Sequence, residues 1–287
     1  MTSLISGKTK VLGIFGYPVE HTFSPAMHNA AFRHLGLDYV YVAFPVKPEN
    51  IARAVDGIRG LNLAGVNVTI PHKSAVIDYL DEVDRGAELI GAVNTIVNDN
   101  GILKGYNTDA PGFVKSLEVD AGVSPRGKRV FLLGAGGAAR AVSIQLALAG
   151  AAEIVFTTPF PQEVTGLRCI INNSTNTRVG EVMWDKEEIL KSLRETDILI
   201  NATPVGMHPA LGEMPPVNPE ALPKGALVCD LIYNPRETML LRKAKEHGFS
   251  TLNGMGMLLY QGAIAFELWT RAEPPLQVMR NALEKAL

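Results

Sequence analysis

The sequence is poor in the features that mark a secreted or membrane-embedded protein. Among its 287 residues only two are cysteines, Cys169 and Cys229, and neither has a neighbouring cysteine at the spacing of a metal site. No uninterrupted apolar run reaches the roughly 18 residues of a membrane span, and Lys8 and Lys10 interrupt the stretch where a signal peptide would be apolar. These absences predict a soluble, cytoplasmic protein whose cysteines are reduced thiols in the core.

An excess of charge of one sign is also missing. The chain has 27 Lys and Arg residues against 29 Asp and Glu residues, which gives a net charge of −2. No bulk basic field recruits nucleic acid or an anionic membrane, so we expect neither as a partner. A hydrophobic content of 47% is typical of a globular chain, and the length suggests about two domains. Both a monomer and a homodimer remain open.

The first 110 residues alternate short apolar runs with amphipathic stretches. The former are typical of strands and the latter of helices. We expect strands over residues 10–16, 39–46, 65–70 and 94–99, and helices over residues 24–36 and 48–60. Strands that alternate with helices predict a mostly parallel α/β sheet.

The alternation begins again after a turn-rich break at residues 118–128. We expect strands over residues 128–134, 153–158, 196–203 and 226–233, a helix over residues 137–150, and two closing helices over residues 256–270 and 275–287. This pattern predicts a second α/β unit of the Rossmann type. Residues 160–180 are weakly patterned and carry no prediction.

The segment GAGGAARA at residues 134–141 fits the G-x-G-x-x-A fingerprint through Gly134, Gly136 and Ala139. It follows a predicted strand and opens a predicted helix, as the fingerprint requires. Gly134 permits the tight turn, Gly136 lets the backbone approach a pyrophosphate, and Ala139 lets helix and strand pack closely. We therefore expect a dinucleotide at this turn; the alternative is a small-residue turn without a ligand.

The end of the next strand should choose between the two nicotinamide dinucleotides. An acidic residue there binds the ribose 2′-hydroxyl, whereas an arginine accepts a 2′-phosphate. This chain has Thr157, Thr158, Pro159 and Phe160 at that point, so neither signal is present.

Polar motifs near the predicted strand ends together indicate a family. In chain order the set is HTFSPAMHN, NVTIPHK, IGAVNT, YNTDAPG, GAGGAARA, NATPVGM, DLIYNP and NGMGMLLYQGA. It resembles the shikimate/quinate dehydrogenase family essentially from end to end. The resemblance implies a catalytic domain of residues 1–110 and 255–287, completed by the C-terminal helices, and a Rossmann dinucleotide-binding domain of residues 111–254. It also implies interconversion of shikimate and 3-dehydroshikimate with a nicotinamide cofactor, in the shikimate pathway of aromatic amino-acid biosynthesis.

The same resemblance assigns Lys73 and Asp109 as the catalytic pair. Hydride transfer to a ketone leaves an alkoxide that must take a proton, and an ammonium near that oxygen supplies it. Asp109 would lie near Lys73 and bind the same hydroxyl region. The alternatives are a surface lysine at position 73 and an Asx turn at position 109.

The resemblance further implies a set of polar substrate contacts. These are Thr22, Ser24, Thr69, Asn94, Tyr233 and Gln261, of which Thr22 and Ser24 would bind the carboxylate. Three alternatives remain open: Ser24 as a helix cap, Asn94 as a buried amide that satisfies the backbone, and Gln261 as a solvent-facing residue. The family usually has serine at position 22, so Thr22 adds a methyl group beside the carboxylate.

The positions expected around the cofactor are mostly small or apolar. They are Gly134, Ala135, Gly136, Gly137, Ala138, Thr158, Thr203, Met207, Ile232, Gly254 and Met257. The alternative is core packing, above all for the two methionines. His21, His28 and His72 are interpreted as structural residues, and we predict no metal.

One departure from the family pattern concerns the cofactor. Members that use NADP typically carry Asn-Arg-Thr after the second Rossmann strand, where this chain has Thr158-Pro159-Phe160. NADP is the family default, and NAD use remains open. We therefore keep an NAD-preferring quinate/shikimate dehydrogenase as one alternative. A non-catalytic dinucleotide-binding regulator and a Rossmann oxidoreductase of another substrate class are further alternatives.

Overall fold

The computed structural model describes residues 5–286, and the chain divides into two compact units. The first unit consists of Met1–Asp109 and Leu259–Leu287, and the second of Ala110–Leu258. The expected boundaries, after residue 110 and before residue 255, lie one and four residues from these positions. None of the helices in the described residues is both long and apolar enough to cross a membrane.

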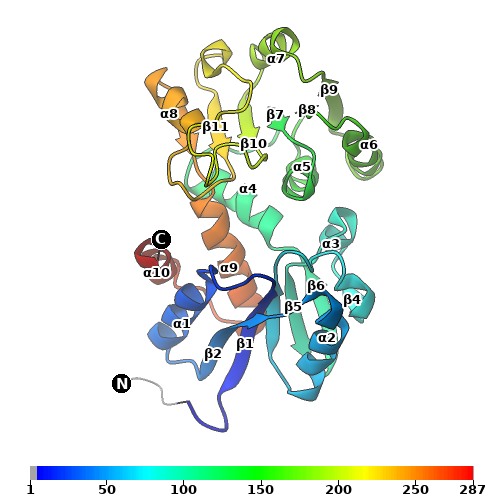
Figure 1. Cartoon of the computed structure of the whole chain (residues 1–287), viewed down its shortest axis with the longest axis vertical. Helices are drawn as coiled ribbons and strands as arrows, with labels where there is room; N and C mark the ends of the chain where they lie inside the picture. Colours follow the sequence, from blue (N-terminus) through cyan, green and yellow to red (C-terminus); the bar gives the residue numbers. More distant parts are fainter. Residues whose placement is uncertain (1–4, 287) are drawn as a thin grey trace. The chain divides into compact units, whose positions relative to one another are not determined.

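The first unit is built on a mixed six-stranded sheet in the order β2-β1-β3-β5-β6-β4 (Figure 1). Its strands are β1 (Lys10–Gly16), β2 (Tyr39–Pro45), β3 (Gly65–Val68), β4 (Glu82–Val83), β5 (Thr95–Asp99) and β6 (Ile102–Tyr106). Strand β1 pairs in parallel with β2 and β3, and β4 pairs in parallel with β6, whereas β5 runs antiparallel to both β3 and β6. The expectation of a mostly parallel sheet therefore needs one correction, at β5.

The reversal between β5 and β6 has a local cause. Asn100 and Gly101 join β5 to β6, and both have positive φ angles, 53° and 96°. An Asn-Gly pair adopts this conformation at low cost and is a strong signal for a two-residue hairpin. The strand β6 was therefore predictable, although no strand was expected between residues 99 and 128.

Helices cover both faces of the first sheet. They are α1 (Ser24–Leu35), α2 (Ile51–Gly60), α3 (Arg85–Ile90), α9 (Met255–Thr270, which belongs to this unit from Leu259 onward) and α10 (Leu276–Ala286). One face packs Val55 and Ile58 of α2 against Val66 and Ile96 of the sheet. On the other face α10 packs against α1 (Figure 1). Burial of these apolar side chains is the main stabilising term of the unit.

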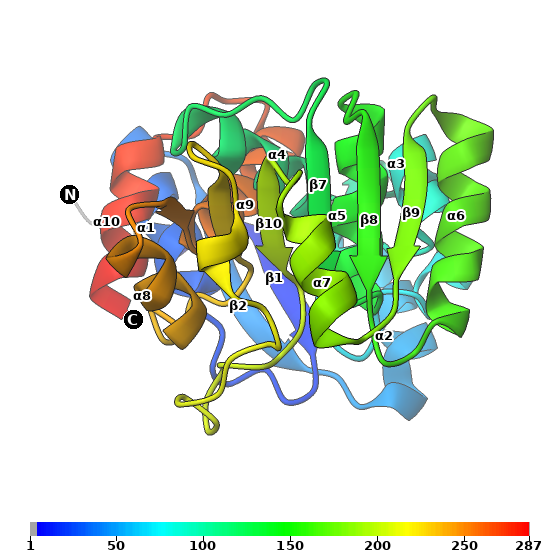
Figure 2. The ribbon, with the colours of Figure 1, turned by 90° about the horizontal axis from the view of Figure 1, so that it is seen from above.

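The second unit has a fully parallel sheet in the order β12-β11-β10-β7-β8-β9. The strands are β7 (Arg129–Leu133), β8 (Glu153–Thr157), β9 (Arg178–Val182), β10 (Ile198–Asn201), β11 (Leu227–Asp230) and β12 (Ser250–Leu252). This is the doubly wound order of a Rossmann unit. Figure 2 shows β7, β8, β9 and β10 running in the same direction. The central strands are continuous apolar runs because both of their faces are buried.

The helices of the second unit are α4 (Asp109–Val119), α5 (Gly137–Leu148), α6 (Gln162–Ser174), α7 (Lys186–Leu193) and α8 (Met239–Glu246). Helix α6 and strand β9 occupy the segment for which no element was predicted. Val164, Leu167 and Ile171 form a buried stripe on α6 at helical spacing, so a signal was present. The prediction for the cysteines was wrong for Cys169, which is exposed on α6, whereas Cys229 is buried in β11.

Candidate functional site

Lys73 and Asp109 form an ion pair in the first unit. The Lys73 Nζ atom donates a hydrogen bond to Asp109 Oδ2 at 2.7 Å. Lys73 lies in the loop after β3, where its carbonyl accepts a hydrogen bond from Val93 N, and Asp109 opens α4 after β6. The two side chains are 33% and 18% exposed. Lys73 is therefore paired rather than freely solvated, and part of its side chain stays exposed.

Buried polar side chains continue from this pair along the sheet edge. Asn94 Oδ1 accepts a hydrogen bond from Thr108 N at 2.7 Å, and Asn94 Nδ2 donates to Thr108 Oγ1 at 3.0 Å. Asn67 Nδ2 donates to the Asn94 carbonyl and to Thr95 Oγ1, both at 3.0 Å. Asn94 therefore does satisfy backbone, as its alternative proposed, and in doing so it fixes the residue that precedes Asp109.

A second part of this network reaches the start of α1. The Ser24 hydroxyl is hydrogen-bonded to the Tyr41 phenol, and Tyr41 Oη donates to Asn67 Oδ1 at 2.7 Å. Burial raises the pKa of Tyr41 well above its usual value, so the phenol stays neutral. The helix-cap alternative for Ser24 is wrong, because Phe23 occupies the N-cap position and no side chain caps α1.

Tyr41 belongs to this network, although it was not singled out from the sequence. A strand was predicted over residues 39–46, but the Asn67 partner of Tyr41 is 26 residues away. We call Ser24, Tyr41, Asn67, Asn94 and Thr108 the sheet-edge network. It holds two of the expected substrate contacts, Ser24 and Asn94, in one connected set.

The remaining expected contacts of the first unit are placed as follows. Thr22 is half-buried, and its Oγ1 accepts a hydrogen bond from Ser24 N at 3.4 Å. Thr69 is half-buried after β3, and a Cβ atom at Gly16 would overlap its methyl group, so glycine permits this approach. Gln261 is buried on α9, which makes the solvent-facing alternative wrong.

In the second unit the glycine turn has the geometry that a pyrophosphate requires. Gly134 has a φ angle of 95°, and a Cβ there would lie 3.1 Å from the Thr203 methyl group. Gly136 is the N-cap of α5 and provides no side-chain cap, and a Cβ at Gly136 or Gly137 would meet no atom within 4 Å. Ala135 and Ala139 are buried and Ala138 is exposed. An uncapped helix start beside open space fits the phosphates of a dinucleotide.

The rim beside this turn is held by Asp230, which the sequence reasoning also missed. Its Oδ1 atom accepts hydrogen bonds from Asn201 Nδ2 and Ile232 N, both at 3.1 Å, and its Oδ2 accepts from Thr238 Oγ1 at 2.7 Å. Burial raises the pKa of Asp230 to about 6, against the lowering effect of these hydrogen bonds. The carboxylate thus links the loops after β10 and β11, which carry Thr203 and Ile232.

The other expected residues of this rim differ in exposure. Ile232 is buried, Tyr233 and Met257 are half-buried, and Met207 is 46% exposed, so core packing is the wrong interpretation for Met207. A Cβ at Gly254 would overlap the Leu231 carbonyl, so this position needs glycine for a close backbone approach. Burial raises the pKa of Tyr233.

Comparison with known proteins decides the family. The model for the shikimate dehydrogenase substrate binding domain matches residues 14–96, and the model for the shikimate 5'-dehydrogenase C-terminal domain matches residues 254–284. A shikimate dehydrogenase (NADP(+)) from Desulforamulus reducens is 52% identical over 281 residues, which cover 98% of this chain and 97% of the relative. The chain belongs to the shikimate dehydrogenase family.

Solved structures of the shikimate dehydrogenase family have the same fold. The enzyme from Listeria monocytogenes, in complex with shikimate and NAD, has a TM-score of 0.93 and 42% identity, with 98% of each chain covered. A shikimate dehydrogenase in complex with NADP+ has a TM-score of 0.89 and 45% identity, with 99% of this chain and 97% of that chain covered. The expected fold, two α/β units of which one is of the Rossmann type, is confirmed.

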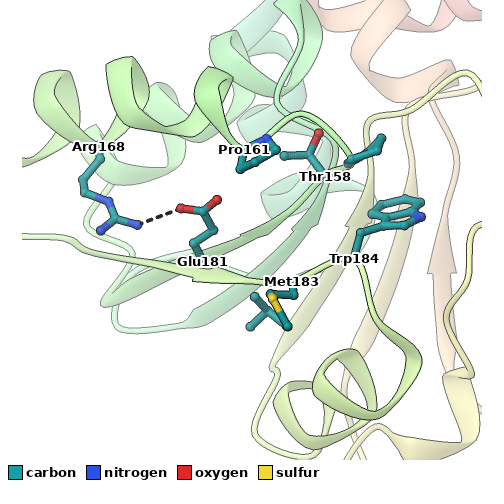
Figure 3. A pocket seen from close by; sticks show the side chains of 8 residues that line it. Thr158, Pro161, Arg168, Glu181, Met183 and Trp184 are labelled. Carbon is teal, nitrogen blue, oxygen red and sulfur yellow. Dashed lines mark hydrogen bonds and ion pairs between the residues drawn. The ribbon is translucent and has the colours of Figure 1, made fainter.

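The end of β8 departs from what the shikimate dehydrogenase family led us to expect. Thr158 is buried, and its Oγ1 accepts a hydrogen bond from Phe160 N at 3.1 Å. None of Thr158, Pro159 and Phe160 has a charged side chain. A pocket of about 550 Å³ opens beside it (Figure 3). Arg168 of α6 and Glu181 of β9 form an ion pair in its wall, with Nη2 and Oε2 3.2 Å apart.

Metal ligands are not grouped in the described residues. Between residues 5 and 286 no cluster of three or more His, Cys, Asp or Glu side chains is arranged to hold a metal ion. The three histidines considered in the sequence analysis differ: His21 is exposed, His72 is buried with Nε2 2.7 Å from the Val46 carbonyl, and His28 is fully buried among aromatic rings.

Proposed function

We propose that this protein catalyses the reversible reduction of 3-dehydroshikimate to shikimate with NADPH, as a shikimate dehydrogenase of the shikimate pathway. The observation that carries the proposal is the 2.7 Å ion pair between Lys73 Nζ and Asp109 Oδ2. This pair lies in the unit that contains the match to the substrate binding domain of the family. The glycine turn of the other unit supports the use of a dinucleotide.

The proton chemistry belongs to Lys73. When NADPH is bound, it supplies the hydride that adds to the carbonyl carbon of the substrate. The carbonyl oxygen then gains negative charge and takes a proton from Lys73 Nζ, so the C=O bond becomes an alcohol. Asp109 holds the ammonium by the hydrogen bond described above and stabilises its charge. In the reverse direction Lys73 accepts the hydroxyl proton.

The sheet-edge network supports substrate binding in the proposal. Ser24 and Thr22 would present hydroxyl donors to the substrate carboxylate, and Asn94, Thr69 and Gln261 would bind ring hydroxyls. Tyr233 of the second unit is proposed as a further contact. Tyr41 orients Ser24, and Thr108 and Thr95 orient the Asn94 amide. Binding therefore does not have to order these side chains at that moment.

The cofactor assignment is NADP. The uncapped start of α5, with Gly134, Gly136 and Gly137 around it, is proposed to bind the pyrophosphate through backbone N–H groups. The remaining proposed contacts are Ala135, Ala138, Thr158, Thr203, Met207, Ile232, Gly254 and Met257. A relative at 52% identity is named as NADP(+)-dependent, which supports NADP for this chain. The use of NAD, and a cytoplasmic location, stay predictions, as does the choice between monomer and homodimer.

Initial rates with a matrix of substrates test the proposal. Shikimate and quinate are each supplied with NADP+ and with NAD+, and we expect the highest kcat/KM for shikimate with NADP+. Dominant turnover of quinate with NAD+ would support the NAD-preferring alternative. Dinucleotide binding without turnover of either acid would indicate a non-catalytic regulator. Turnover of an unrelated alcohol alone would indicate another substrate class.

A further inference from the structure

The pocket at the carboxyl ends of β8 and β9 lies entirely within the second unit and has a polar end and an aromatic end. In Figure 3 the Arg168–Glu181 pair lies at one end and the Trp184 indole at the other, with Thr158 and Pro161 along one wall. We call it the β8–β9 pocket. Its volume of about 550 Å³ is sufficient for a nucleoside-sized group.

The position of this pocket corresponds to one part of a bound dinucleotide. In a Rossmann unit the pyrophosphate binds at the turn after the first strand, and the 2′ position of the adenosine ribose is read at the end of the second strand. Here β7 is the first strand and β8 is its neighbour, and Thr158 directly follows β8. The β8–β9 pocket therefore begins where the 2′ position is read.

A single cation lines this pocket. Arg168 lies on α6, ten positions after Thr158, and is the one Lys or Arg among the described residues of the lining. Its Nη2 donates to Glu181 Oε2 at 3.2 Å, and the two side chains are 43% and 31% exposed. An ion pair of this exposure contributes little stability, so its partner can be exchanged at low cost. A planar guanidinium is well suited to a phosphate.

We propose that Arg168 binds the 2′-phosphate of NADP(H) in this protein, and that Glu181 weakens this binding by competing for the same guanidinium. The inference rests on the dinucleotide use proposed above. Arg168 of α6 would then bind the 2′-phosphate, because the turn after β8, Thr158-Pro159-Phe160, has no charged side chain to do so. With a cofactor that lacks the phosphate, the Arg168–Glu181 pair remains intact. Discrimination between NADP and NAD is accordingly set by the balance between one carboxylate and one phosphate.

Binding of two adenosine nucleotides to the full chain tests this assignment. The probes are adenosine 2′,5′-bisphosphate and adenosine 5′-monophosphate, and isothermal calorimetry gives Kd for each. We expect Arg168→Ala to raise the Kd of the bisphosphate about tenfold or more relative to that of the monophosphate. Glu181→Gln should lower the Kd of the bisphosphate several-fold, because the competing carboxylate is gone, with little change for the monophosphate.

Two further variants act as matched controls. Arg178→Ala removes another arginine, the first residue of β9. The Arg178 side chain is 77% exposed and its Nη2 atom lies 4.0 Å from Glu153 Oε2, so neither Kd should change. Arg168→Lys keeps the charge without the planar fork, and we expect a Kd between those of the parent protein and the alanine variant.

The outcomes separate this inference from the proposed function. If Arg168→Ala weakens the binding of both nucleotides equally, or of neither, the role of Arg168 is refuted. If the Kd of the bisphosphate is unchanged in Glu181→Gln, the competition by Glu181 is refuted. A protein that binds the bisphosphate through Arg168 but does not oxidise shikimate would retain this inference and refute the proposed function. Turnover of shikimate with the same KM for NADP+ in the parent protein and in Arg168→Ala would refute this inference alone.

Discussion

The two units of the molecule hold their candidate site residues by different means. In the first unit, side chains from distant parts of the sequence are joined in the sheet-edge network, which ends next to the Lys73–Asp109 pair. In the second unit the main features are backbone ones, the turn at Gly134 and the uncapped start of α5. Proton transfer and hydroxyl recognition need oriented side chains, whereas phosphates need backbone N–H groups.

The units also differ in the kind of titratable group that they bury: the first unit buries a base, His28, and the second an acid, Asp230. His28 of the first unit is fully buried beside Tyr41, Phe266 and Trp269, and burial lowers its pKa to about 3. Asp230 of the second unit has its pKa raised to about 6 by burial. Both shifts favour the neutral form of the side chain. The two groups therefore make stability depend on pH in opposite directions, which gives each unit its own acid response.

The largest expected effect concerns the reactive pair itself. Lys73→Met removes the group that accepts the hydroxyl proton in shikimate oxidation while keeping the length of the side chain, and we expect kcat for this oxidation to fall about 10²–10⁴-fold. The matched control is Lys104→Met in the same unit. Lys104 is 32% exposed and paired with Glu82 at 3.3 Å, and its loss should leave kcat unchanged. A Lys73→Met protein that keeps near-parental kcat would show that this lysine is not the acid/base group.

The acid response of the first unit depends on His28. In the described structure neither ring nitrogen of His28 has a hydrogen-bond partner. With a folded pKa of about 3 against 6.5 when unfolded, the unfolded chain binds the extra proton, so stability is lost as pH falls below 6.5. We expect His28→Phe to gain about 3 kcal/mol relative to the parent between pH 7 and pH 4. Urea unfolding at several pH values measures this difference.

The control for this prediction is His21→Phe, because His21 is exposed and its replacement removes a histidine without removing a buried one. A difference between parent and His28→Phe that does not change with pH would contradict the assigned burial effect.

The second unit should respond in the opposite direction through Asp230. Its folded pKa of about 6 lies above the unfolded value of 3.8, so the folded state binds the extra proton and stability is lost as pH rises through this window. Asp230→Asn keeps the shape and one acceptor oxygen but removes the charge and replaces the other oxygen by an N–H donor. We expect this variant to gain about 2 kcal/mol relative to the parent between pH 4 and pH 7, measured by urea unfolding. A gain in the other direction would show that the hydrogen bonds outweigh burial.

The smallest expected effect sharpens the description of the sheet-edge network. Tyr41→Phe leaves Asn67 Oδ1 without its phenol donor and frees the Ser24 hydroxyl, so we expect a loss of about 1–2 kcal/mol in unfolding free energy. The KM for shikimate should rise more than kcat falls, because Ser24 loses its fixed orientation. Tyr39→Phe, on the same strand but half-exposed, is the control. An unchanged KM would mean that Ser24 does not depend on Tyr41.

Much of this structure was predictable where local signals act alone. The glycine turn and helix α5 follow from fingerprint spacing, and the strands β1, β2, β7 and β8 follow from their apolar runs. Predicted strands were often one to four residues too long, since the strand-like sequence pattern continues past the last ladder hydrogen bond. Helix α6 was missed because polar residues such as Asn172 and Asn173 obscured the stripe formed by Val164, Leu167 and Ile171.

The site could be predicted only in part. Lys73 and Asp109 were named through a family resemblance, but their contact spans 36 positions and no local pattern encodes it. Tyr41, Asp230 and Arg168 were not named, because each acts through a partner brought close by tertiary folding. A predicted strand does not show which amide accepts the hydrogen bond of a tyrosine in that strand.

The hairpin at Asn100–Gly101 controls more than the direction of one strand. Strand β6 runs antiparallel to β5, so the chain leaves β6 near Lys73. Thr108 and Asp109 follow the last residue of β6 by two and three positions. Side chains in a strand alternate between the two faces of the sheet. Adding one residue to this hairpin would therefore shift the register of β6 and reverse the faces to which its side chains point. The position of Asp109 relative to Lys73 therefore depends on the turn at Asn100–Gly101.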